Sequence, residues 1–391
     1  MENEIVYLSN SIIPSRTANS VHVMKMTEQF SKNFKKVTLV AANDIRYQEK
    51  GINDEFEFYN VNKSFNIRYI TKNNIPKFRN IIYSFKAGKL VNEYKTDLVY
   101  SRDILGCLFA LRNGKSALFE CHNVPSSKVN RMIFKAIVTH EKFLGLVVIS
   151  EALKKIMVNE FNEILNKDDI LVAHDGSDLE RFEKLPSKSS AREQLGITQS
   201  EKIIGYIGHL YSGRGIEIIV QLAKLNPDYN FYIIGGNHSD VEANREQCSK
   251  ENIKNINFLG FLSQSEIMKY WSVFDVLLMP YQNKVSVGKG KLNTVEYMSP
   301  LKMFEYLASN VPFISSDIPV LREVLVNREN CLLVNPTNVS QWNSALKELI
   351  NSSELRKEII ANQKNTVKEY SWAKRAQEIS QFIYHKKAQI K

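Results

Sequence analysis

The stretch Ser299-Pro300-Leu301-Lys302-Met303-Phe304-Glu305-Tyr306-Leu307, followed by Val311-Pro312-Phe313-Ile314-Ser315-Ser316-Asp317, predicts a helix and then a strand. Ser299 is a favoured N-cap residue and Pro300 suits the first helical position. The free amides of a first turn attract anions, and Lys302 adds a cation that opposes the helix dipole unless an anion lies nearby. Glu305 follows about one turn later, within reach of a ligand's hydroxyl groups. This pattern fits a phosphate-binding turn, and it fits an ordinary amphipathic helix equally well.

Length and composition indicate a soluble protein of two domains. The chain has 391 residues, of which 43% are hydrophobic and 24% are charged. No apolar run approaches the ~20 residues that cross a bilayer, and the start Met1–Glu4 lacks the features of a signal peptide. We therefore expect a cytoplasmic protein. The four cysteines form no Cys-x-x-Cys pair, so we expect reduced thiols rather than a zinc site or disulfides at Cys107, Cys121, Cys248 and Cys331.

Positive charge is concentrated in the first part of the chain. The formal net charge is +10, and residues 1–150 hold 22 Lys and Arg against 13 Asp and Glu, a balance of +9. Such a surface could face anionic lipid, nucleic acid or a phosphate-bearing acceptor. The segment Ile75–Lys95 mixes basic with aromatic and aliphatic residues, a pattern typical of an amphipathic helix on a membrane surface. A core-facing helix with a solvated basic back explains the same pattern.

Short runs rich in β-branched residues alternate with helical patterns, which indicates parallel sheets covered by helices on both faces. The first series of predicted strands is Glu4–Ser9, Lys36–Ala41, Asn66–Thr71, Asp97–Ser101, Ala117–Cys121, Leu146–Ser150 and Ile170–Ala173. After the polar segment Leu185–Thr198 the second series is Lys202–Ile207, Asn230–Ile234, Asn257–Leu259, Asp275–Met279, Pro312–Ser315 and Leu332–Val334. We therefore predict an α/β protein with two doubly wound, Rossmann-like domains, residues 1–185 and 186–370, and a terminal helical segment, residues 371–391. Ligands of such sheets bind beyond the carboxyl ends of the strands, so an inter-domain cleft is the expected site.

A glycine-rich turn, Gly208-His209-Leu210-Tyr211-Ser212-Gly213-Arg214-Gly215, follows the first predicted strand of the second domain. Its glycines permit a close approach to the backbone, and Arg214 can bind a phosphate through two hydrogen bonds. His209 can donate one hydrogen bond to a phosphate or cap a turn. A single turn of this kind is weak support for a nucleotide site.

Two strands of the first domain end in polar residues. His122, in Phe119-Glu120-Cys121-His122-Asn123, lies where α/β proteins place functional residues, although a hydrogen-bonded core histidine is the more usual explanation. Asp103 also ends a strand and could bind an acceptor, whereas the neighbouring Arg102 is equally consistent with an ordinary polar surface.

The loop after the first predicted strand offers a third group of polar residues. Arg16 could reach an acceptor phosphate. The backbone amides of Asn19 and Ser20 could bind an anion, because we expect a helix to begin near Ser20.

The stretch around Glu305 resembles the nucleotide-sugar motif of the retaining family 4 glycosyltransferases, which have the GT-B fold. In that family a Glu, seven residues and a second Glu lead into a helix and a short strand. Glu305 matches the second Glu, whereas the first position holds Tyr297, with Glu296 one place earlier. The chain is similar to the branch in which a Ser-Pro-Leu-Lys turn replaces the usual Glu-Gly-Phe-Gly turn.

The resemblance, which covers nearly the whole chain, implies roles for single residues. Catalytic roles are implied for His122, close to the transferred sugar, and for Arg214, Lys302 and Glu305. Donor binding is implied for Gly208, His209, Gly235, Phe261, Leu262, Ser299, Pro300 and Leu301. In this set the backbone at Phe261 and Leu262 would meet the base, and Gly235 would line the pocket floor. At the acceptor we expect Arg16, Asn19 and Asp103, and the terminal helix is expected to pack back on the first domain.

The implied reaction moves a sugar from a UDP- or GDP-linked donor to an acceptor hydroxyl, with retention at the anomeric carbon and no covalent enzyme intermediate. The leaving diphosphate would take the acceptor proton, while Arg214, Lys302 and the turn at Pro300 stabilise the developing charge. No cofactor and no metal is expected, because the sequence holds no Asp-x-Asp motif and no Walker loop. The expected partners are a nucleotide sugar and a glycan or lipid-linked acceptor of cell-surface polysaccharide assembly, at the inner face of an anionic membrane.

Two other interpretations stay open. A nucleotide-sugar epimerase would convert the donor without an acceptor, and a phosphorylase would release a sugar phosphate, both on the same fold. A non-catalytic nucleotide- or polyanion-binding module would explain the missing first Glu and the basic first domain. Nucleic acid is not expected as a partner, because the basic residues form no recognisable nucleic-acid-binding motif.

Overall fold

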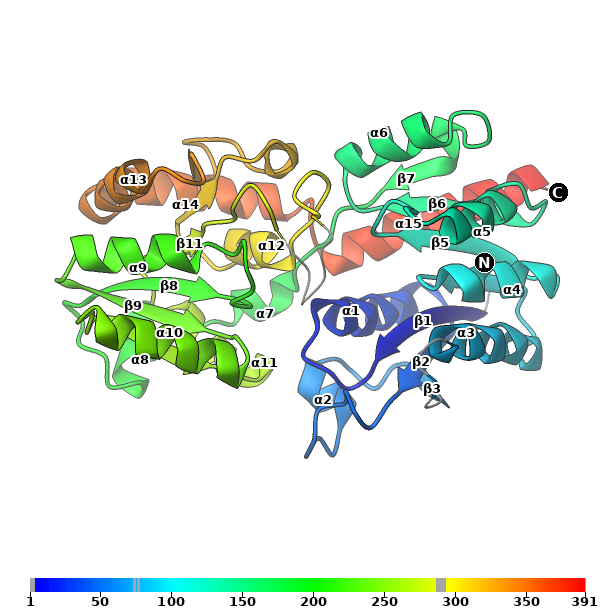
Figure 1. The fold of residues 1–391 in the computed structure, drawn as a ribbon, viewed down its shortest axis with the longest axis horizontal. Coiled ribbons are helices and arrows are strands. Elements are labelled where there is room, and N and C mark those ends of the chain that lie inside the picture. Colours follow the sequence, from blue (N-terminus) through cyan, green and yellow to red (C-terminus); the bar gives the residue numbers. More distant parts are fainter. Residues whose placement is uncertain (1–3, 73–74, 76–77, 286–292, 391) are drawn as a thin grey trace. The chain divides into compact units, whose positions relative to one another are not determined.

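The computed structural model describes residues 4–72, 75, 78–285 and 293–390. The chain divides into two compact units, Met1–Asp175 together with Trp372–Lys391, and Gly176–Ser371 (Figure 1). This division falls ten residues before the predicted boundary at residue 185. The cause is helix α7 (Leu179–Glu183), because its Phe182 packs on Trp271 of the second unit with ring centroids 5.2 Å apart.

The described part of the first unit holds a seven-stranded parallel sheet in the order β3-β2-β1-β4-β5-β6-β7. Its central strands are buried along their shared register, where Val6 lies opposite Val99, and this burial explains their almost continuous apolar sequence. The seven predicted strands are confirmed, with ends shifted by at most three residues: β1 (Glu4–Ile12), β2 (Lys36–Asn43), β3 (Asn66–Thr71), β4 (Leu98–Ser101), β5 (Ser116–Cys121), β6 (Phe143–Val148) and β7 (Ile170–Val172).

Helices cover both faces of this sheet, because its strand order runs outward in both directions from β1 and right-handed crossovers then place helices on opposite faces. Helices α3, α4 and α5 pack as neighbours in one layer, and α1 packs along α15 in the other (Figure 1). The helices are α1 (Ala18–Asn33), α2 (Glu55–Tyr59), α3 (Arg79–Leu90), α4 (Ile104–Arg112), α5 (Lys128–Val138), α6 (Glu151–Glu160) and α15 (Trp372–Ile390). Helix α3 is shorter than the predicted helix Ile75–Lys95, of which Lys77 lies outside the described residues.

The terminal helix α15 belongs to the first unit, although the rest of that unit ends at Asp175. Its buried residues recur at helical spacing, which gives the helix one apolar stripe against the unit: Trp372, Ala376, Ile379 and Ile383. Arg375 lies on the same buried side, and only 3% of its surface is exposed.

The second unit holds a six-stranded parallel sheet among its described residues, in the order β10-β9-β8-β11-β12-β13. Its predicted strands are likewise confirmed: β8 (Lys202–Ile207), β9 (Tyr229–Ile234), β10 (Ile256–Gly260), β11 (Val276–Met279), β12 (Phe313–Ser316) and β13 (Leu332–Val334). The remaining helices are α8 (Lys188–Gln194), α9 (Ile216–Leu225), α10 (His238–Lys250), α11 (Gln264–Trp271), α12 (Leu301–Ala308), α13 (Val339–Asn351) and α14 (Ser353–Val367).

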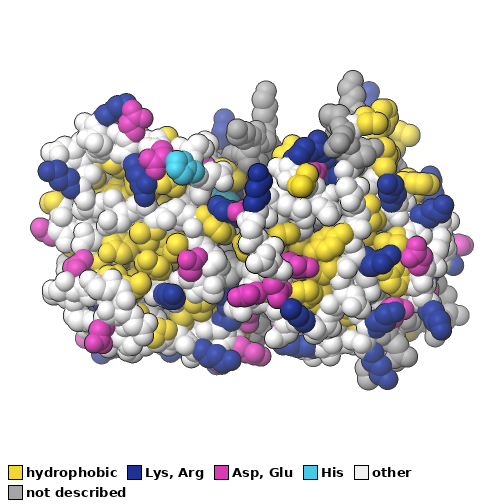
Figure 2. Space-filling view, turned by 90° about the horizontal axis from the view of Figure 1, so that it is seen from below, with side chains coloured by type: hydrophobic (Ala, Val, Ile, Leu, Met, Phe, Trp, Pro, Cys, Tyr) yellow, Lys and Arg dark blue, Asp and Glu magenta, His cyan; other side chains and the backbone are white. Residues whose placement is uncertain are grey.

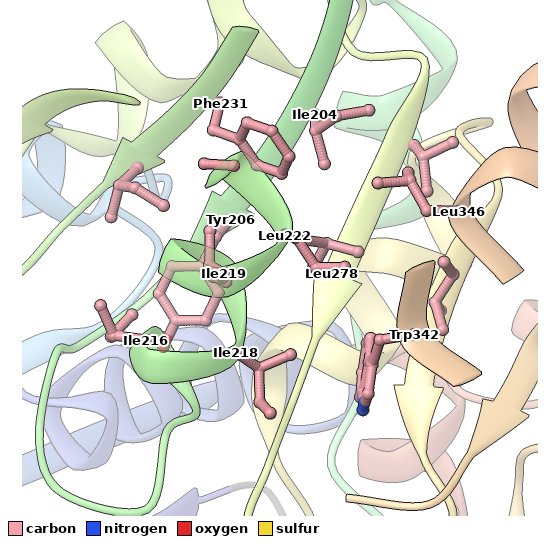
Figure 3. Packing of buried hydrophobic residues seen from close by; sticks show 14 of the residues in the cluster. Ile204, Tyr206, Ile216, Ile218, Ile219, Leu222, Phe231, Leu278, Trp342 and Leu346 are labelled. Carbon is pink, nitrogen blue, oxygen red and sulfur yellow. The ribbon is translucent and has the colours of Figure 1, made fainter. Parts of the chain in front are cut away.

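The core of the second unit lies between this sheet and helices α9 and α13. Figure 3 shows Ile219 and Leu222 of α9 facing strand residues such as Leu278, with Trp342 of α13 beside them. Tyr206 at the end of β8 belongs to the same buried cluster. The apolar stripes of the two helices therefore fix the strand from which the glycine-rich turn leaves.

Helix α12 begins one residue later than the sequence predicts. Pro300, with φ −77° and ψ 125°, occupies the N-cap position, and its carbonyl accepts the first turn's hydrogen bond from the amide of Met303 at 2.9 Å. The predicted N-cap at Ser299 and the first helical position at Pro300 are therefore wrong by one residue. The ring of Pro300 fixes φ but leaves ψ free, so the residue can lie just outside the helix as readily as just inside it. Lys302 is consequently the second helical residue.

Two predictions from composition can also be compared with the structure. All four cysteines are free and buried, and burial raises the pKa of the Cys121 thiol to about 12. Within the described residues, no helix combines the length and the hydrophobicity that spanning a bilayer requires.

Candidate active site

The turns that follow β8, β9 and β10 pack on one another at the carboxyl edge of the second sheet. The amide of Gly208 donates to the carbonyl of Ile234 at 2.8 Å, and the amide of Gly235 donates to that of Gly260 at 2.6 Å. A Cβ atom on Gly235, whose φ is +112°, would lie 2.3 Å from the carbonyl oxygen of Gly208. Glycine is therefore required at 235, both by the backbone conformation and by this close approach.

Lys302 reaches from the first turn of α12 to the glycine-rich turn. Its Nζ atom donates to the hydroxyl of Tyr206 at 2.9 Å and lies 5.3 Å from the ring centroid of Tyr281. A Cβ atom on Gly208 would lie only 2.4 Å from the same nitrogen. The structure thus brings together Gly208 and Lys302, two residues that the sequence analysis placed in one donor site from separate motifs.

Tyr206 connects the two parts of this site. Its hydroxyl accepts from Lys302 and donates to the backbone carbonyl of His209 at 2.6 Å, so both functions of the hydroxyl are used. The side chain is fully buried in the core of the unit. A rigid residue therefore holds the ammonium group against the turn.

Positive charge accumulates at this edge. Burial, and then Arg214, hold the pKa of Lys302 well below its usual range, while Glu305 acts in the opposite direction. Burial, followed by Arg214 and Lys302, also lowers the pKa of His209 to about 4. Among the described residues, neither Lys302 nor Arg214 forms an ion pair with a carboxylate. Half-buried cations that form no ion pair with a described carboxylate match a bound anion such as a diphosphate.

Aromatic rings also support the side chains of Arg214 and His209. The guanidinium carbon of Arg214 lies 5.0 Å from the ring centroid of Tyr281, and the ring of His209 stacks on Tyr211 at 4.7 Å. Such contacts fix the direction of each side chain without supplying negative charge.

The remaining predicted donor residues lie in the same unit. Phe261 and Leu262 follow β10 directly and are half-buried, and Glu305 lies one turn after Lys302 on α12, also half-buried. Leu301 opens α12, and Ser299 and Pro300 precede it. At the position of the family's first Glu, Tyr297 is buried, while Glu296 beside it is exposed.

In the first unit, His122 follows β5 and pairs with Glu120. Its Nε2 atom lies 2.7 Å from Oε1 of Glu120, and one fifth of its side chain is exposed. The other carboxylate oxygen of Glu120 accepts from the hydroxyls of Tyr100 at 2.6 Å and Tyr7 at 3.4 Å. Burial lowers the pKa of His122 to about 4, followed by the charge of Arg102, so the ring is neutral near pH 7.

Helices α1 and α15 add further groups to this cluster. The ring nitrogens of His22 lie 3.1 Å from Glu120 Oε1 and 2.9 Å from Asp175 Oδ1. Arg375 donates from Nη2 to Glu120 Oε1 at 2.7 Å and from Nε to the carbonyl of His174 at 3.0 Å. Glu120 is therefore the centre of a buried network.

Part of the same cluster has the spacing of a metal site. Ligand atoms of His22, Glu120 and His122 lie within 4.8 Å of one another, a spacing that a metal ion could bridge. However, Glu120 Oε1 already accepts from Arg375, and a metal ion would have to lie beside that guanidinium cation. The geometry favours a hydrogen-bonded ion-pair network over a metal centre.

The three predicted acceptor residues lie in different environments. Arg16 is exposed and pairs with Glu49, and Asn19 donates to the hydroxyl of Ser11 at 2.6 Å. Asp103 precedes α4 and is buried, which raises the pKa of its carboxyl group to about 6. The three residues share the first unit, but these contacts do not join them into one site.

The predicted anion site at Asn19 and Ser20 is partly occupied by the chain itself. Helix α1 begins at Ala18 rather than near Ser20, and Thr17 is its N-cap. The amide of Ser20 donates to the Thr17 side chain at 3.2 Å, so the cap satisfies a donor that an anion would need.

Sequence reasoning missed Tyr206 and Arg375 as members of these clusters. Tyr206 is the last but one residue of the buried strand β8, where its pattern is that of an ordinary core residue. Arg375 carries a usable signal, because a charged residue occupies the apolar stripe of an otherwise amphipathic helix between Trp372 and Ile379.

Most of the second unit matches a known protein family. Residues 187–366 match the family model of glycosyl transferases group 1. The match includes both the Gly208 turn and α12, so the two parts of the cationic site lie inside it.

Several relatives of known sequence are named as glycosyltransferases. An uncharacterized glycosyltransferase of Methanocaldococcus jannaschii is 24% identical over 336 residues, which cover 82% of this chain and 85% of that protein. A D-inositol 3-phosphate glycosyltransferase of Corynebacterium urealyticum is 25% identical over 227 residues, which cover 55% of this chain and half of that protein.

Solved structures are similar in fold to nearly the whole chain. HepE of Anabaena, in complex with UDP-glucose, superposes with a TM-score of 0.74 at 14% identity and covers 98% of this chain and 99% of its own. Together with the two parallel sheets, this likeness shows that the chain has the GT-B fold.

Proposed function

We propose that the protein is a retaining glycosyltransferase that moves a sugar from a nucleoside diphosphate donor to an acceptor hydroxyl. The observation that carries the proposal is the position of the half-buried Lys302, whose ammonium group is held by Tyr206 against the Gly208 turn with Arg214 as a second cation. These residues lie within the segment that matches the glycosyl transferases group 1. The donor is UDP- or GDP-linked, and the UDP-glucose bound to HepE favours uridine.

Each residue of the cationic site has a part in this reaction. Lys302 and Arg214 stabilise the negative charge that develops on the leaving diphosphate, and the free amides of α12 add to their effect. Because two cations supply this charge, the reaction needs no metal ion. The leaving diphosphate takes the proton of the acceptor hydroxyl, and Glu305 binds sugar hydroxyls. The Gly208 turn lets the diphosphate approach the backbone closely.

His122 of the first unit contributes a second function. The neutral ring donates from Nε2 to Glu120, which leaves Nδ1 as an acceptor for a hydroxyl of the transferred sugar. A neutral acceptor is suited to a hydroxyl group, whereas an imidazolium would repel the positive charge that develops at the anomeric carbon.

The surface of the first unit suits an acceptor embedded in an anionic membrane. Helix α3 and the residue before it expose Phe78, Ile81 and Phe85, which recur at helical spacing, and α3 also exposes Lys86 and Lys89. On the face of the first unit seen in Figure 2, Lys and Arg side chains lie among hydrophobic ones. We therefore extend the proposal to a lipid-linked acceptor and a peripheral place on the inner face of the membrane.

A thermal-shift panel tests the donor site. The full-length protein is heated with UDP, GDP, ADP and their common sugar conjugates, beside the variants Lys302→Ala and Glu305→Ala. The matched control is Lys250→Ala, which removes an exposed lysine of the same unit. We expect one diphosphate to stabilise the wild type and Lys250→Ala but not Lys302→Ala. If none stabilises the wild type, the proposal fails and a non-catalytic polyanion-binding module becomes the better account.

Turnover distinguishes the remaining alternatives. A transferase releases the diphosphate faster when an acceptor is present. An epimerase would convert the donor with no acceptor added, and a phosphorylase would need inorganic phosphate.

A further inference from the structure

The carboxylate of Glu120 is buried without exposure and is surrounded by donors on both oxygens. Burial alone would raise its pKa, but Arg375, followed by His22 and Arg102, holds the pKa well below its usual range. The group is therefore a carboxylate, which can only accept hydrogen bonds.

A carboxylate at this position decides which nitrogen of His122 carries the proton. Because Glu120 Oε1 lies 2.7 Å from Nε2 and can only accept, Nε2 must be the protonated nitrogen of the neutral ring. The lone pair then lies on Nδ1. If Glu120 were neutral or turned away, this choice between tautomers would be lost.

Arg375 is the nearest fixed cation to Glu120, and it comes from the far end of the chain. Its side chain is 2% exposed, and it is anchored twice, by Nη2 to Glu120 and by Nε to the carbonyl of His174. The anchor gives the guanidinium one position, so the carboxylate that it holds also has one position.

We propose that Arg375 of the C-terminal helix is a positioning residue, which acts through Glu120 to fix the ring and the tautomer of His122. The inference rests on the proposed function, because the tautomer of His122 matters to the reaction only if Nδ1 faces a sugar hydroxyl. His22, held between Glu120 and Asp175, closes the network from α1 and prevents Glu120 from rotating towards it.

The alternative is a buried ion pair that only stabilises the fold. The chain provides a matched pair of that kind in Arg192 of α8, whose side chain is also 2% exposed and whose Nη2 lies 2.9 Å from Oδ2 of Asp275. Arg192 likewise donates to a backbone carbonyl, that of Val273. It contacts no residue that we place in the reaction.

The experiment uses full-length protein labelled with ¹⁵N in its histidine rings. Long-range ¹H–¹⁵N spectra report which ring nitrogen carries the proton, and His122→Gln assigns the signals of His122. The first variant is Arg375→Lys, which keeps the positive charge but cannot donate to Glu120 and to the carbonyl of His174 from two fixed nitrogens. The second is the double change Arg375→Met with Glu120→Gln, which leaves no unpaired charge at this pair. The controls are Arg192→Lys and the double change Arg192→Met with Asp275→Asn.

The wild type is expected to show His122 with Nε2 protonated and Nδ1 unprotonated near pH 7. Arg375→Lys is expected to mix the tautomers and lower kcat by about tenfold or more, with the donor KM little changed. The Arg375/Glu120 double variant regains thermal stability but not kcat. Both Arg192 controls keep the wild-type His122 signals and kcat.

Two results would overturn the inference. One is an unchanged His122 spectrum in both Arg375 variants, and the other is recovery of kcat together with stability in the double variant. Failure of the proposed function would look different, because the wild type would then bind no nucleoside diphosphate whatever the spectrum of His122 showed.

Discussion

The Nζ atom of Lys302 donates to the hydroxyl of Tyr206 at 2.9 Å, and that hydroxyl in turn donates to the carbonyl of His209. A cation on a helix that begins at residue 301 is thus joined to the turn after β8, almost a hundred residues earlier. The ammonium group has an aromatic hydroxyl as its partner where a carboxylate would neutralise it. Because Lys302 forms no ion pair with a described carboxylate, its ammonium group is available to a ligand anion.

Lys302→Met is expected to separate stability from binding. It removes a desolvated cation, so the free energy of unfolding near pH 7 should rise by about 1 kcal/mol or more. Diphosphate affinity should fall about 10- to 100-fold, because a charge-assisted hydrogen bond is lost. Chemical denaturation and titration calorimetry measure the two effects. A variant that is both less stable and fully competent in binding would contradict our account of Lys302.

The stability gain should also depend on pH. The pKa of Lys302 is lowered by folding from its ordinary value of 10.5, so the unfolded chain binds more protons in the window between the two values. Stability of the wild type therefore rises with pH across that window, and the advantage of Lys302→Met shrinks as pH approaches 10.5.

Tyr206→Phe is expected to keep the buried ring but release Lys302 and the carbonyl of His209. The loss of two hydrogen bonds should weaken diphosphate binding about tenfold, with little change in the folded spectrum. Titration calorimetry and circular dichroism measure these effects. Wild-type affinity in this variant would show that Tyr206 does not position the cation.

Gly208→Ala tests the close packing of the turn on Lys302. The new Cβ atom would lie 2.4 Å from Nζ and 2.9 Å from Cε, so the lysine would have to move and diphosphate binding should fall about tenfold or more. Gly196→Ala is the control, since φ there is +67° but no atom lies within 4 Å of the added carbon. It should cost about 1 kcal/mol of stability and leave calorimetric affinity unchanged.

His209 should take up a proton when a diphosphate ester binds. Its pKa is lowered to about 4 in the free protein, chiefly by burial and then by the two neighbouring cations, and a bound anion reverses the effect of those cations. Affinity for UDP-glucose should therefore strengthen as pH falls from 7 to 5. Calorimetry in two buffers with different ionisation enthalpies counts the protons, and His209→Asn should abolish the uptake.

Asp103→Asn should change how stability depends on pH. Folding raises the pKa of Asp103 from 3.8 to about 6, so the folded protein binds more protons between these values and its stability falls as pH rises through them. The stability of the variant should not fall between pH 4 and 6. At pH 7 the variant should therefore be more stable than the wild type by about 1 kcal/mol or more. Denaturation at pH 4, 5, 6 and 7 measures the difference, and parallel curves for the two proteins would contradict it.

The sequence predicted the sheets well because parallel strands are buried on both faces and carry continuous apolar runs. Each predicted strand of both sheets is present. The start of α12 was predicted one residue early, because the capping preferences of Ser299 and Pro300 fit two neighbouring positions and only the backbone dihedrals decide between them.

One candidate site residue has a local signal in the sequence. Lys302 is unusual for its own helical turn, so a local rule about the helix dipole identified it. Arg375 has no such local signature beyond its place in an apolar stripe, and its partner Glu120 lies 255 residues away. Contacts of that sequence separation follow from the fold and not from a motif, which is why the network around His122 was missed.

The most direct test of the central claim is the configuration of the sugar released from the donor. The full-length protein is incubated with the nucleotide sugar that stabilises it most, with and without an acceptor, and the first product is observed by ¹H NMR before it can mutarotate. We expect the anomeric configuration of the donor to be retained, at a rate that Lys302→Ala reduces about 100-fold or more. An inverted product, or no release of sugar from any donor that binds, would contradict the account.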